Sequence, residues 1–317
     1  MSVFTEVSRT ELEDFVRGYD LGRLLSYQGI SAGSENSNFF VSCEGGEFVL
    51  TLVERGPVAD LPFFIQLLER LQADGLPVPF AVPDRQGQAL QSLNGRPALL
   101  QPRLPGKHIA EPDASHCKAV GQTLARLHNS TESSGLQRNS DRGLAWMDKQ
   151  LAQLFGHCSV EQQALLAPLQ SLLENWLQNP PQLAQTVLHA DLFRDNVLFD
   201  GHHLSGVIDF YNAASGWTLY DVAICVNDWC LNPQQQLHPE RTQALLAGYA
   251  SIRRFTPAEA EHWPDMLRLA ALRFWLSRRL AAQQHEGQSG VLIKEPEHFL
   301  RVLAQHERVS IGLPLAL

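Results

Sequence analysis

The spacing of apolar residues changes about a third of the way along the chain. Before residue 102 the apolar runs are short and separated by small polar residues, as in an antiparallel meander, and they predict strands at 24–30, 39–41, 47–53, 80–83, 88–93 and 96–101. Two helices are also expected here: Ser8 to Glu11 has the form of a capping box, and apolar residues recur at helical spacing over 61–71.

Helical periodicity prevails after the break at Pro102-Arg103-Leu104-Pro105-Gly106. It predicts helices at 113–129, 144–155, 160–178, 220–229, 239–252, 257–285 and 294–307. We therefore expect an N-terminal β-rich domain at 1–101 and a C-terminal helical domain at 102–317. A small sheet-rich part followed by a larger helical part is an α+β arrangement.

One stretch of the second part departs from helical spacing. Residues 187–210 read VLHADLFRDNVLFDGHHLSGVIDF: an apolar approach, a polar loop, a strand, a turn and a second strand. This hairpin is expected to bring Asp191, Asn196 and Asp209 to one edge. His-Ala-Asp alone is compatible with loop capping. Asn five residues after the first Asp, and then an Asp flanked by apolar residues, make a far more specific set.

Composition narrows the class of protein. The chain has 317 residues, 44% of them hydrophobic and 19% charged, which is typical of a soluble globular protein with room for two cores. A net charge of −9 without a Lys/Arg run argues against nucleic acid or an anionic membrane as a partner. Five scattered cysteines and the absence of a signal pattern predict reduced thiols and a cytoplasmic location. His202-His203, beside a turn, is expected to be solvated surface rather than a zinc site.

The pattern H-x-D-x-x-x-x-N followed by an apolar-flanked Asp resembles the catalytic core of the protein-kinase-like phosphotransferases, in the branch of the aminoglycoside phosphotransferases and choline kinases. The resemblance implies a two-lobe fold that uses ATP and Mg²⁺. It implies that Asp191 accepts or orients the acceptor hydroxyl, while Asn196 and Asp209 ligate Mg²⁺, a hard ion that prefers oxygen ligands. It also implies that His189 and Asp221 support the catalytic loop.

The same resemblance locates the nucleotide in the strand-rich part. The small polar loop at 31–38 stands where this superfamily covers the phosphates, and small side chains let backbone N–H groups approach phosphate oxygens. Adenine is expected near the backbone of residues 100–104. Nucleotide contacts are predicted for Gly33, Ser34, Asn36, Ser37, Thr51, Gln101 and Leu104.

Thr51 stands where many kinase-like enzymes have a lysine on the third strand. Phe63-Phe64 stands about where the glutamate partner of that lysine is expected. Losing both members of the pair leaves no unpaired charge. The phosphates would then be stabilised by loop N–H groups, the Thr51 hydroxyl and Mg²⁺. A catalytically inactive nucleotide-binding pseudokinase is the alternative that this departure leaves open.

Several segments are similar to one family in this branch, the homoserine kinases of the aminoglycoside-phosphotransferase-like type; they lie at 29–38, 48–52, 189–193, 209–213, 219–230 and 272–278. That family implies phosphorylation of L-homoserine to O-phospho-L-homoserine, a step toward threonine. The substrate carboxylate needs a cation, and its ammonium needs acids or carbonyls. Substrate contacts are predicted for Glu35, Tyr211, Asp228 and Arg273.

Two alternatives remain open at this point. For Arg273, and for Arg278 on the same expected helix, the other interpretation is a surface or interlobe salt bridge. For the acceptor, another small molecule phosphorylated by the same fold is possible, namely choline, an aminoglycoside, hydroxylysine or methylthioribose.

Overall fold

The computed structural model of the chain describes residues 4–30, 36–54, 56–284, 295–308 and 311–315. Its described residues fall into two compact units. The first comprises the chain up to Pro105 together with Ser205–Ile208, and the second comprises Gly106–Leu204 and the chain from Asp209 onward. The domain boundary between residues 101 and 102 stays a prediction. No helix in the described ranges combines the length and the apolar character needed to span a membrane.

A five-stranded sheet forms the first unit, with the strand order β1-β2-β3-β5-β4 and antiparallel pairing throughout. Its strands are β1 (Leu24–Gly29), β2 (Ser37–Cys43), β3 (Gly46–Leu52), β4 (Gln91–Leu93) and β5 (Arg96–Pro102). The predicted meander is confirmed. The prediction of a strand at 80–83 is wrong. Val82 donates one backbone hydrogen bond to the carbonyl oxygen of Leu100 at 2.7 Å, but the segment is not paired as a strand. Pro79 and Pro83 flank the segment and lack the N–H groups that a ladder needs.

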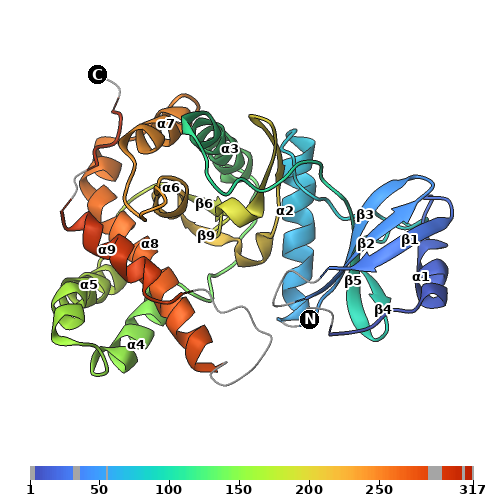
Figure 1. Ribbon diagram of the computed structural model, residues 1–317, viewed down its shortest axis with the longest axis horizontal. Helices are drawn as coiled ribbons and strands as arrows, with labels where there is room; N and C mark the ends of the chain where they lie inside the picture. The colour runs from blue at the N-terminus through green and yellow to red at the C-terminus, as the bar shows by residue number, and fades with distance from the viewer. Residues whose placement is uncertain (1–3, 31–35, 55, 285–294, 309–310, 316–317) are drawn as a thin grey trace. The chain divides into compact units, whose positions relative to one another are not determined.

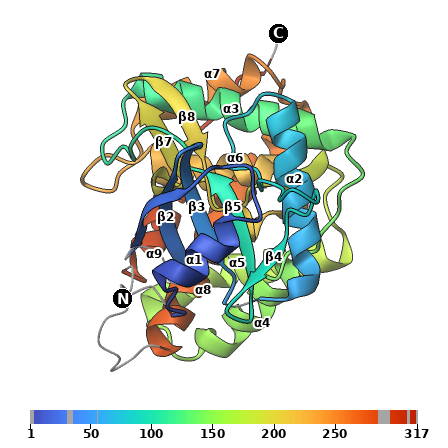
Figure 2. The ribbon, with the colours of Figure 1, turned by 90° about the vertical axis from the view of Figure 1, so that its right-hand side faces the viewer.

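Helix α1 (Arg9–Val16) closes the core of this unit. The capping box predicted at Ser8 is confirmed, because the Ser8 hydroxyl accepts from the N–H of Glu11 while the Glu11 carboxylate accepts from the N–H of Ser8. Leu12 and Val16 of α1 then pack with apolar residues of the strands, and the helix lies across the sheet (Figure 2). The 3₁₀ turn η1 (Val58–Asp60) leads into the second helix, α2 (Leu61–Ala73).

The second unit is mainly helical (Figure 1). Helices α4 and α5 begin and end where the apolar spacing predicts. The described helices of this unit are α3 (Ala114–Glu132), α4 (Leu144–Phe155), α5 (Val160–Gln178), α6 (Thr218–Trp229), α7 (Pro239–Ala250), α8 (Pro257–Gln284) and α9 (His298–His306).

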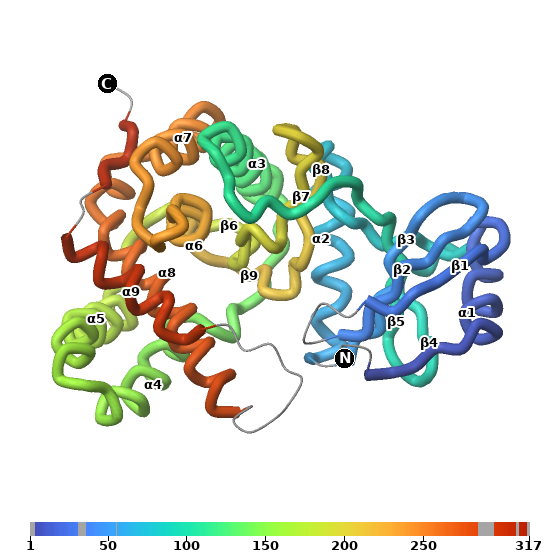
Figure 3. The backbone as a smooth tube through the Cα atoms, in the orientation of Figure 1, coloured from blue at the N-terminus to red at the C-terminus, as the bar shows by residue number. Residues whose placement is uncertain are grey.

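Helices α3 and α7 lie side by side with almost no space between their backbones (Figure 3). A Cβ atom added to Gly121 of α3 would lie 2.1 Å from the carbonyl oxygen of Leu245, and one added to Gly248 of α7 would lie 2.4 Å from that of Lys118. Only glycine allows this approach. The contact anchors α3, whose His128 contacts Asp221 of the site described below.

Short strands flank the loop at 189–196, which carries Asp191 and is called the catalytic loop after its predicted role. Strand β6 (Gln185–Leu188) pairs antiparallel with β9 (Ala214–Trp217), and β7 (Val197–Asp200) pairs with β8 (His203–Val207) as the predicted hairpin. The 3₁₀ turns η2 (Arg194–Asn196) and η3 (Phe210–Asn212) connect these strands. Strand β9 was not predicted, because Ala214–Trp217 carries no alternating apolar pattern and its partner is distant in the sequence.

Candidate active site

The carboxylate of Asp221, on α6, holds the backbone that leads to Asp191. Its Oδ2 accepts the N–H of His189 and its Oδ1 accepts the N–H of Ala190, both at 2.9 Å. Ala190 has a φ of 61°, a left-handed conformation that is unfavourable for a residue with a side chain. The two hydrogen bonds to a buried charge stabilise this conformation, which turns the chain sharply just before Asp191.

His128 completes the environment of Asp221. Its Nε2 lies 3.1 Å from Asp221 Oδ2, and its Nδ1 lies 2.9 Å from the hydroxyl of Tyr249. Burial raises the pKa of Asp221. The hydrogen bond and charge of His128, together with the N–H and charge of His189, lower it by more, so the net pKa is below the ordinary value. Asp221 is thus a buried carboxylate whose ionised form is stabilised. Sequence reasoning did not find the contribution of His128.

Asn212 contacts the side chain of Asp191 directly. Its Nδ2 donates to Asp191 Oδ2 at 3.1 Å, and its Oδ1 accepts from Arg273 at 3.3 Å. Arg273 also donates to the carbonyl oxygen of Ala190 at 3.0 Å and is only 3% exposed. Burial lowers the pKa of Arg273, against the opposing effect of Tyr220 and Asp191. Arg273 and Asn212 therefore fix both the backbone and the carboxylate of the loop.

Asn196 and Asp209 lie at the two ends of the β7–β8 hairpin. Asn196 Nδ2 donates to the carbonyl oxygen of Asp191 at 2.8 Å, which sets the orientation of the amide and leaves its oxygen as the atom that can ligate a cation. Asp209 follows β8, has a φ of 63° and is exposed. The hairpin thus brings two oxygen donors of the predicted Mg²⁺ set onto one short element, as expected from the sequence. Their roles as ligands stay a prediction.

Asp228 contacts the catalytic loop rather than open solvent. Its carboxylate accepts the backbone N–H of Arg194 at 2.8 Å and forms an ion pair with the Arg194 guanidinium at 3.2 Å. If Asp228 binds the substrate, as predicted, its carboxylate has to contact both the substrate and Arg194. The sequence interpretation did not include this pair, because Arg194 and Asp228 lie on different elements. Tyr211, in η3 one residue before Asn212, is partly buried.

Aromatic packing anchors the loop from the other side. The ring of Phe193 lies 4.4 Å from that of Phe274 on α8 and 5.7 Å from that of Phe299 on α9, measured between ring centroids. The carbonyl oxygen of Leu192 accepts the indole N–H of Trp229 at 2.9 Å. Ala190 and Leu192, the two neighbours of Asp191 in the chain, are both held by hydrogen bonds, which limits how far the Asp191 backbone can move.

In the first unit, the polar residues predicted to bind the nucleotide form hydrogen bonds with neighbouring residues of the same unit. Thr51 donates its hydroxyl to Asn38 Oδ1 at 2.7 Å, so a neutral pair occupies the position of the missing lysine. The Ser37 hydroxyl accepts from the N–H groups of Phe4 and Thr5 and donates to Glu54. Its hydrogen-bonding capacity is therefore used within the first unit.

The remaining predicted nucleotide positions have these placements. Asn36 is buried and accepts the N–H of Glu54, while Gln101 donates to the carbonyl oxygen of Pro79 at 2.6 Å. Leu104 is partly buried. Gly33, Ser34 and Glu35 lie outside the described residues. Nucleotide binding by these positions stays a prediction.

Comparison with known proteins agrees with this geometry. Residues 26–255 match the model of the phosphotransferase enzyme family. The chain belongs to this family. A homoserine kinase of Pseudomonas aeruginosa is 58% identical over 317 residues, covering 100% of both chains. A homoserine kinase of Methylobacillus flagellatus is 41% identical, covering 96% of this chain and 94% of that protein.

Solved phosphotransferases share the fold at low identity. An amicoumacin kinase in complex with AMP-PNP and Ca²⁺ has a TM-score of 0.68 at 17% identity, with 98% of this chain and 96% of that chain covered. A spectinomycin phosphotransferase in complex with ADP and spectinomycin has a TM-score of 0.67 at 12% identity, with 96% and 100% covered. The predicted α+β, protein-kinase-like fold is confirmed.

Proposed function

We propose that this protein transfers the γ-phosphoryl group of ATP to the hydroxyl of L-homoserine, giving O-phospho-L-homoserine and ADP. The observation that carries the proposal is the full-length likeness to homoserine kinases, up to 58% identity without a gap in coverage at either end. Membership of the phosphotransferase family and the order of Asp191, Asn196 and Asp209 along one hairpin support it. The protein acts, on this proposal, as a small-molecule kinase of amino-acid biosynthesis.

Asp191 is the residue proposed to meet the acceptor. The homoserine hydroxyl oxygen bonds to the γ-phosphorus, the bond from that phosphorus to the β–γ bridging oxygen breaks, and the hydroxyl proton passes to Asp191 or solvent. Bond breaking to the leaving group runs ahead of proton loss, so orientation of the hydroxyl matters more than base strength. The bond from Asn212 holds the carboxylate in one rotamer, which serves that orientation.

Asn196 and Asp209 are proposed to hold Mg²⁺. One amide oxygen and one carboxylate suit a hard cation that keeps several water and phosphate ligands. When bound, the ion neutralises charge on the triphosphate. This contribution is large in a protein that has a Thr51–Asn38 pair in place of a phosphate-binding lysine.

Arg278 is a better candidate than Arg273 for the substrate carboxylate. Arg273 is buried and committed to Ala190 and Asn212. Burial lowers the pKa of Arg278, while Asp228, Asp195 and Asp191 oppose this effect, so its guanidinium lies within the electrostatic reach of the catalytic loop. Its guanidinium also lies 4.4 Å from the centre of the Phe299 ring.

An acceptor panel tests the activity. The purified protein is incubated with ATP, Mg²⁺ and either L-homoserine, choline, an aminoglycoside, hydroxylysine or methylthioribose, and the product is identified by ³¹P NMR. Phosphate ester is expected with homoserine at a kcat/KM at least a hundredfold above the others. A preference for another acceptor would refute the substrate, and ATP binding without transfer to any of them would restore the pseudokinase alternative.

Two matched pairs of variants test the residues. Asp191→Asn is expected to lower kcat by about a thousandfold with ATP affinity retained, whereas Asp200→Asn, the same change at the exposed hairpin turn, is expected to leave both unchanged. Arg278→Met is expected to raise KM for homoserine by tenfold or more without changing KM for ATP, unlike the neighbouring Arg279→Met. If the two variants of a pair have the same kinetic constants, the residue tested by that pair does not have the proposed role.

A further inference from the structure

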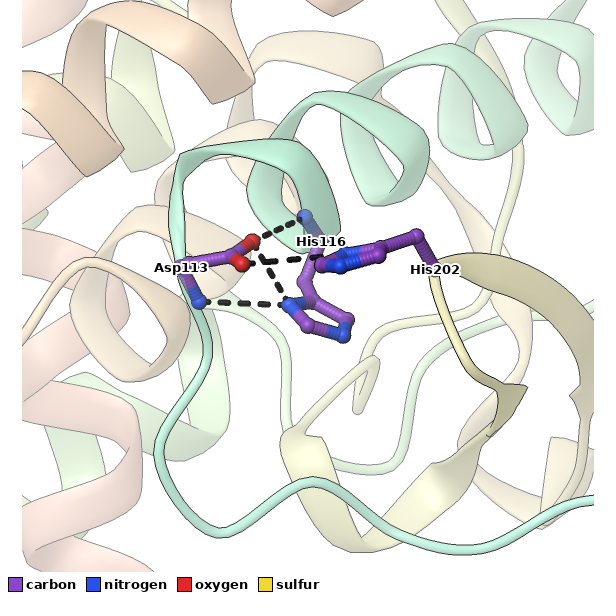
Figure 4. A group of neighbouring side chains, drawn as sticks. All are labelled: Asp113, His116 and His202. Carbon is purple, nitrogen blue, oxygen red and sulfur yellow. Dashed lines mark hydrogen bonds and ion pairs between the residues drawn. The ribbon is translucent and has the colours of Figure 1, made fainter.

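A second group of ligand-type side chains lies on the second unit, at the start of α3 and in the turn of the β7–β8 hairpin (Figure 4). Asp113 is the N-cap of α3, His116 is in its first turn, and His202 lies in the turn between β7 and β8. One ligand atom from each of the three residues lies within 4.8 Å of those of the other two. The sequence interpretation treated His202 as solvated surface, because it could not show that the turn meets the start of α3.

The capping box of α3 orients this group. Asp113 Oδ1 accepts the N–H of His116 at 3.0 Å, which uses one carboxylate oxygen for the helix cap. The other oxygen, Oδ2, lies 3.6 Å from His202 Nδ1. The rings of His116 and His202 lie 4.7 Å apart between centroids. The cap therefore turns Oδ2 toward His202, as the close view shows (Figure 4).

Hydrogen bonds orient the ring of His116. Nε2 lies 3.3 Å from the carbonyl oxygen of Gly201, which can only accept, so Nε2 donates a proton to it. Nδ1 faces Asp113 and lies 2.7 Å from its Oδ1. Histidine ligands of metal ions commonly donate their second ring nitrogen to a backbone carbonyl in this way. His116 thus presents a fixed, nearly buried nitrogen donor to the cluster.

The shortest contact of the cluster joins His116 to Asp113. His116 Nδ1 lies 2.7 Å from Asp113 Oδ1, the distance of a hydrogen bond in which Nδ1–H donates to the carboxylate. A metal ion would take the place of this proton, because metal ligands bind in their deprotonated form. His202 would supply the third ligand.

We propose that Asp113, His116 and His202 form a binding site for a divalent transition-metal ion of the zinc class, with water in the remaining position. Two imidazoles and one carboxylate select such an ion over Mg²⁺, which prefers oxygen ligands. Ligands of a tetrahedral zinc ion lie about 3.3 Å apart, given metal–ligand bonds of about 2.0–2.1 Å.

To reach this spacing, the two exposed ligands would move toward His116. The side chains of His202 and Asp113 are 66% and 54% exposed and can adjust, whereas that of His116 is 10% exposed and is held by Gly201.

Such an ion would link the start of α3 to the turn of the β7–β8 hairpin. Strand β7 begins directly after Asn196, so the ion would restrain the element that carries the proposed Mg²⁺ ligands. It is a separate site from theirs, with a different ligand chemistry. The proposal does not depend on the identity of the acceptor.

Zinc titration of the chelator-treated, full-length protein tests the site. Isothermal titration calorimetry and thermal unfolding are measured with excess Mg²⁺ and ADP present, so that the catalytic acids are occupied. One zinc ion per chain is expected to bind and raise the unfolding temperature, because binding to the native state stabilises it. His202→Ala is expected to weaken binding at least tenfold, and it lies on the surface, so the fold should persist by circular dichroism.

His203→Ala is the matched control, because His203 is exposed, follows His202 directly and lies outside the cluster. It should bind zinc like the wild type. Cobalt gives an independent readout: the wild type and His203→Ala should show the visible absorption of low-coordinate cobalt, and His202→Ala should lose it. The proposal is overturned if the wild type binds no zinc, if His202→Ala binds it equally well, or if His203→Ala loses as much affinity as His202→Ala.

Discussion

Replacing Asp221 by asparagine tests whether its charge holds the catalytic loop. The change keeps the size of the side chain and removes one acceptor oxygen. In the folded protein Oδ1 accepts the N–H of Ala190 and Oδ2 accepts that of His189, each at 2.9 Å. An asparagine can serve only one of them. Its NH₂ group then faces the other N–H, with no acceptor between two donors.

The contacts set the size of the effect. One hydrogen bond to a charged group is lost, which costs about 1.5–3 kcal/mol, and the other becomes a neutral bond, which costs about 1 kcal/mol more. His128 Nε2, 3.1 Å from Oδ2, also loses its partner charge. The relief of burying a charge offsets part of this sum. We expect the free energy of unfolding to fall by about 3 kcal/mol, and kcat to fall at least tenfold as Ala190 leaves its left-handed conformation.

Urea unfolding followed by far-UV circular dichroism measures the stability, and phosphate-ester formation measures kcat. Asp200→Asn, the same change at an exposed turn, is the control and should shift the free energy of unfolding by less than about 0.5 kcal/mol. A loss below about 1 kcal/mol in Asp221→Asn, or an unchanged kcat, would refute the reasoning, because the loop would then hold its shape without the buried charge.

Three other predictions follow from single contacts. Gly121→Ala is expected to cost 3 kcal/mol or more, on the order of a severe overpacking, since its Cβ would lie 2.1 Å from the carbonyl oxygen of Leu245; a urea midpoint equal to that of the wild type would contradict it. Burial, with the charge of Arg268, lowers the pKa of His306 to about 4, so the unfolded state, with a pKa of about 6.5, binds more protons between these values. Stability should therefore fall as pH drops from about 6.5 to about 4, by roughly 3 kcal/mol in total, and His306→Gln should flatten the urea-midpoint profile in that window. Asn212→Ala should lower kcat about tenfold with little change in KM for ATP, because Asp191 loses its positioning bond; an unchanged kcat would show that the bond is dispensable.

The site combines residues that the sequence pointed to with others that it could not. Asp191, Asn196 and Asp209 stood out because their spacing within one hairpin is local and specific. Asn212 lies only three residues after Asp209, yet nothing in the pattern distinguishes an amide that contacts Asp191 from an ordinary loop asparagine. Arg273 and Asp228 reach the loop from separate elements, and His128 contacts Asp221, which holds the backbone of the loop. Their partners depend on the path of the chain, which spacing along the sequence does not encode.

Local pattern determined the parts of the fold that depend on near neighbours. The capping box at Ser8, the limits of Leu144–Phe155 and Val160–Gln178, and the hairpin after Asn196 all follow from side chains a few residues apart. Tertiary structure alone decided that Ala214–Trp217 is a strand, since its hydrogen-bonding partner is β6. Likewise, only the folded chain brings Asp221 under the catalytic backbone and His202 against the start of α3. Contacts between distant segments are set by how helices and strands pack, and several packings are compatible with the same local pattern.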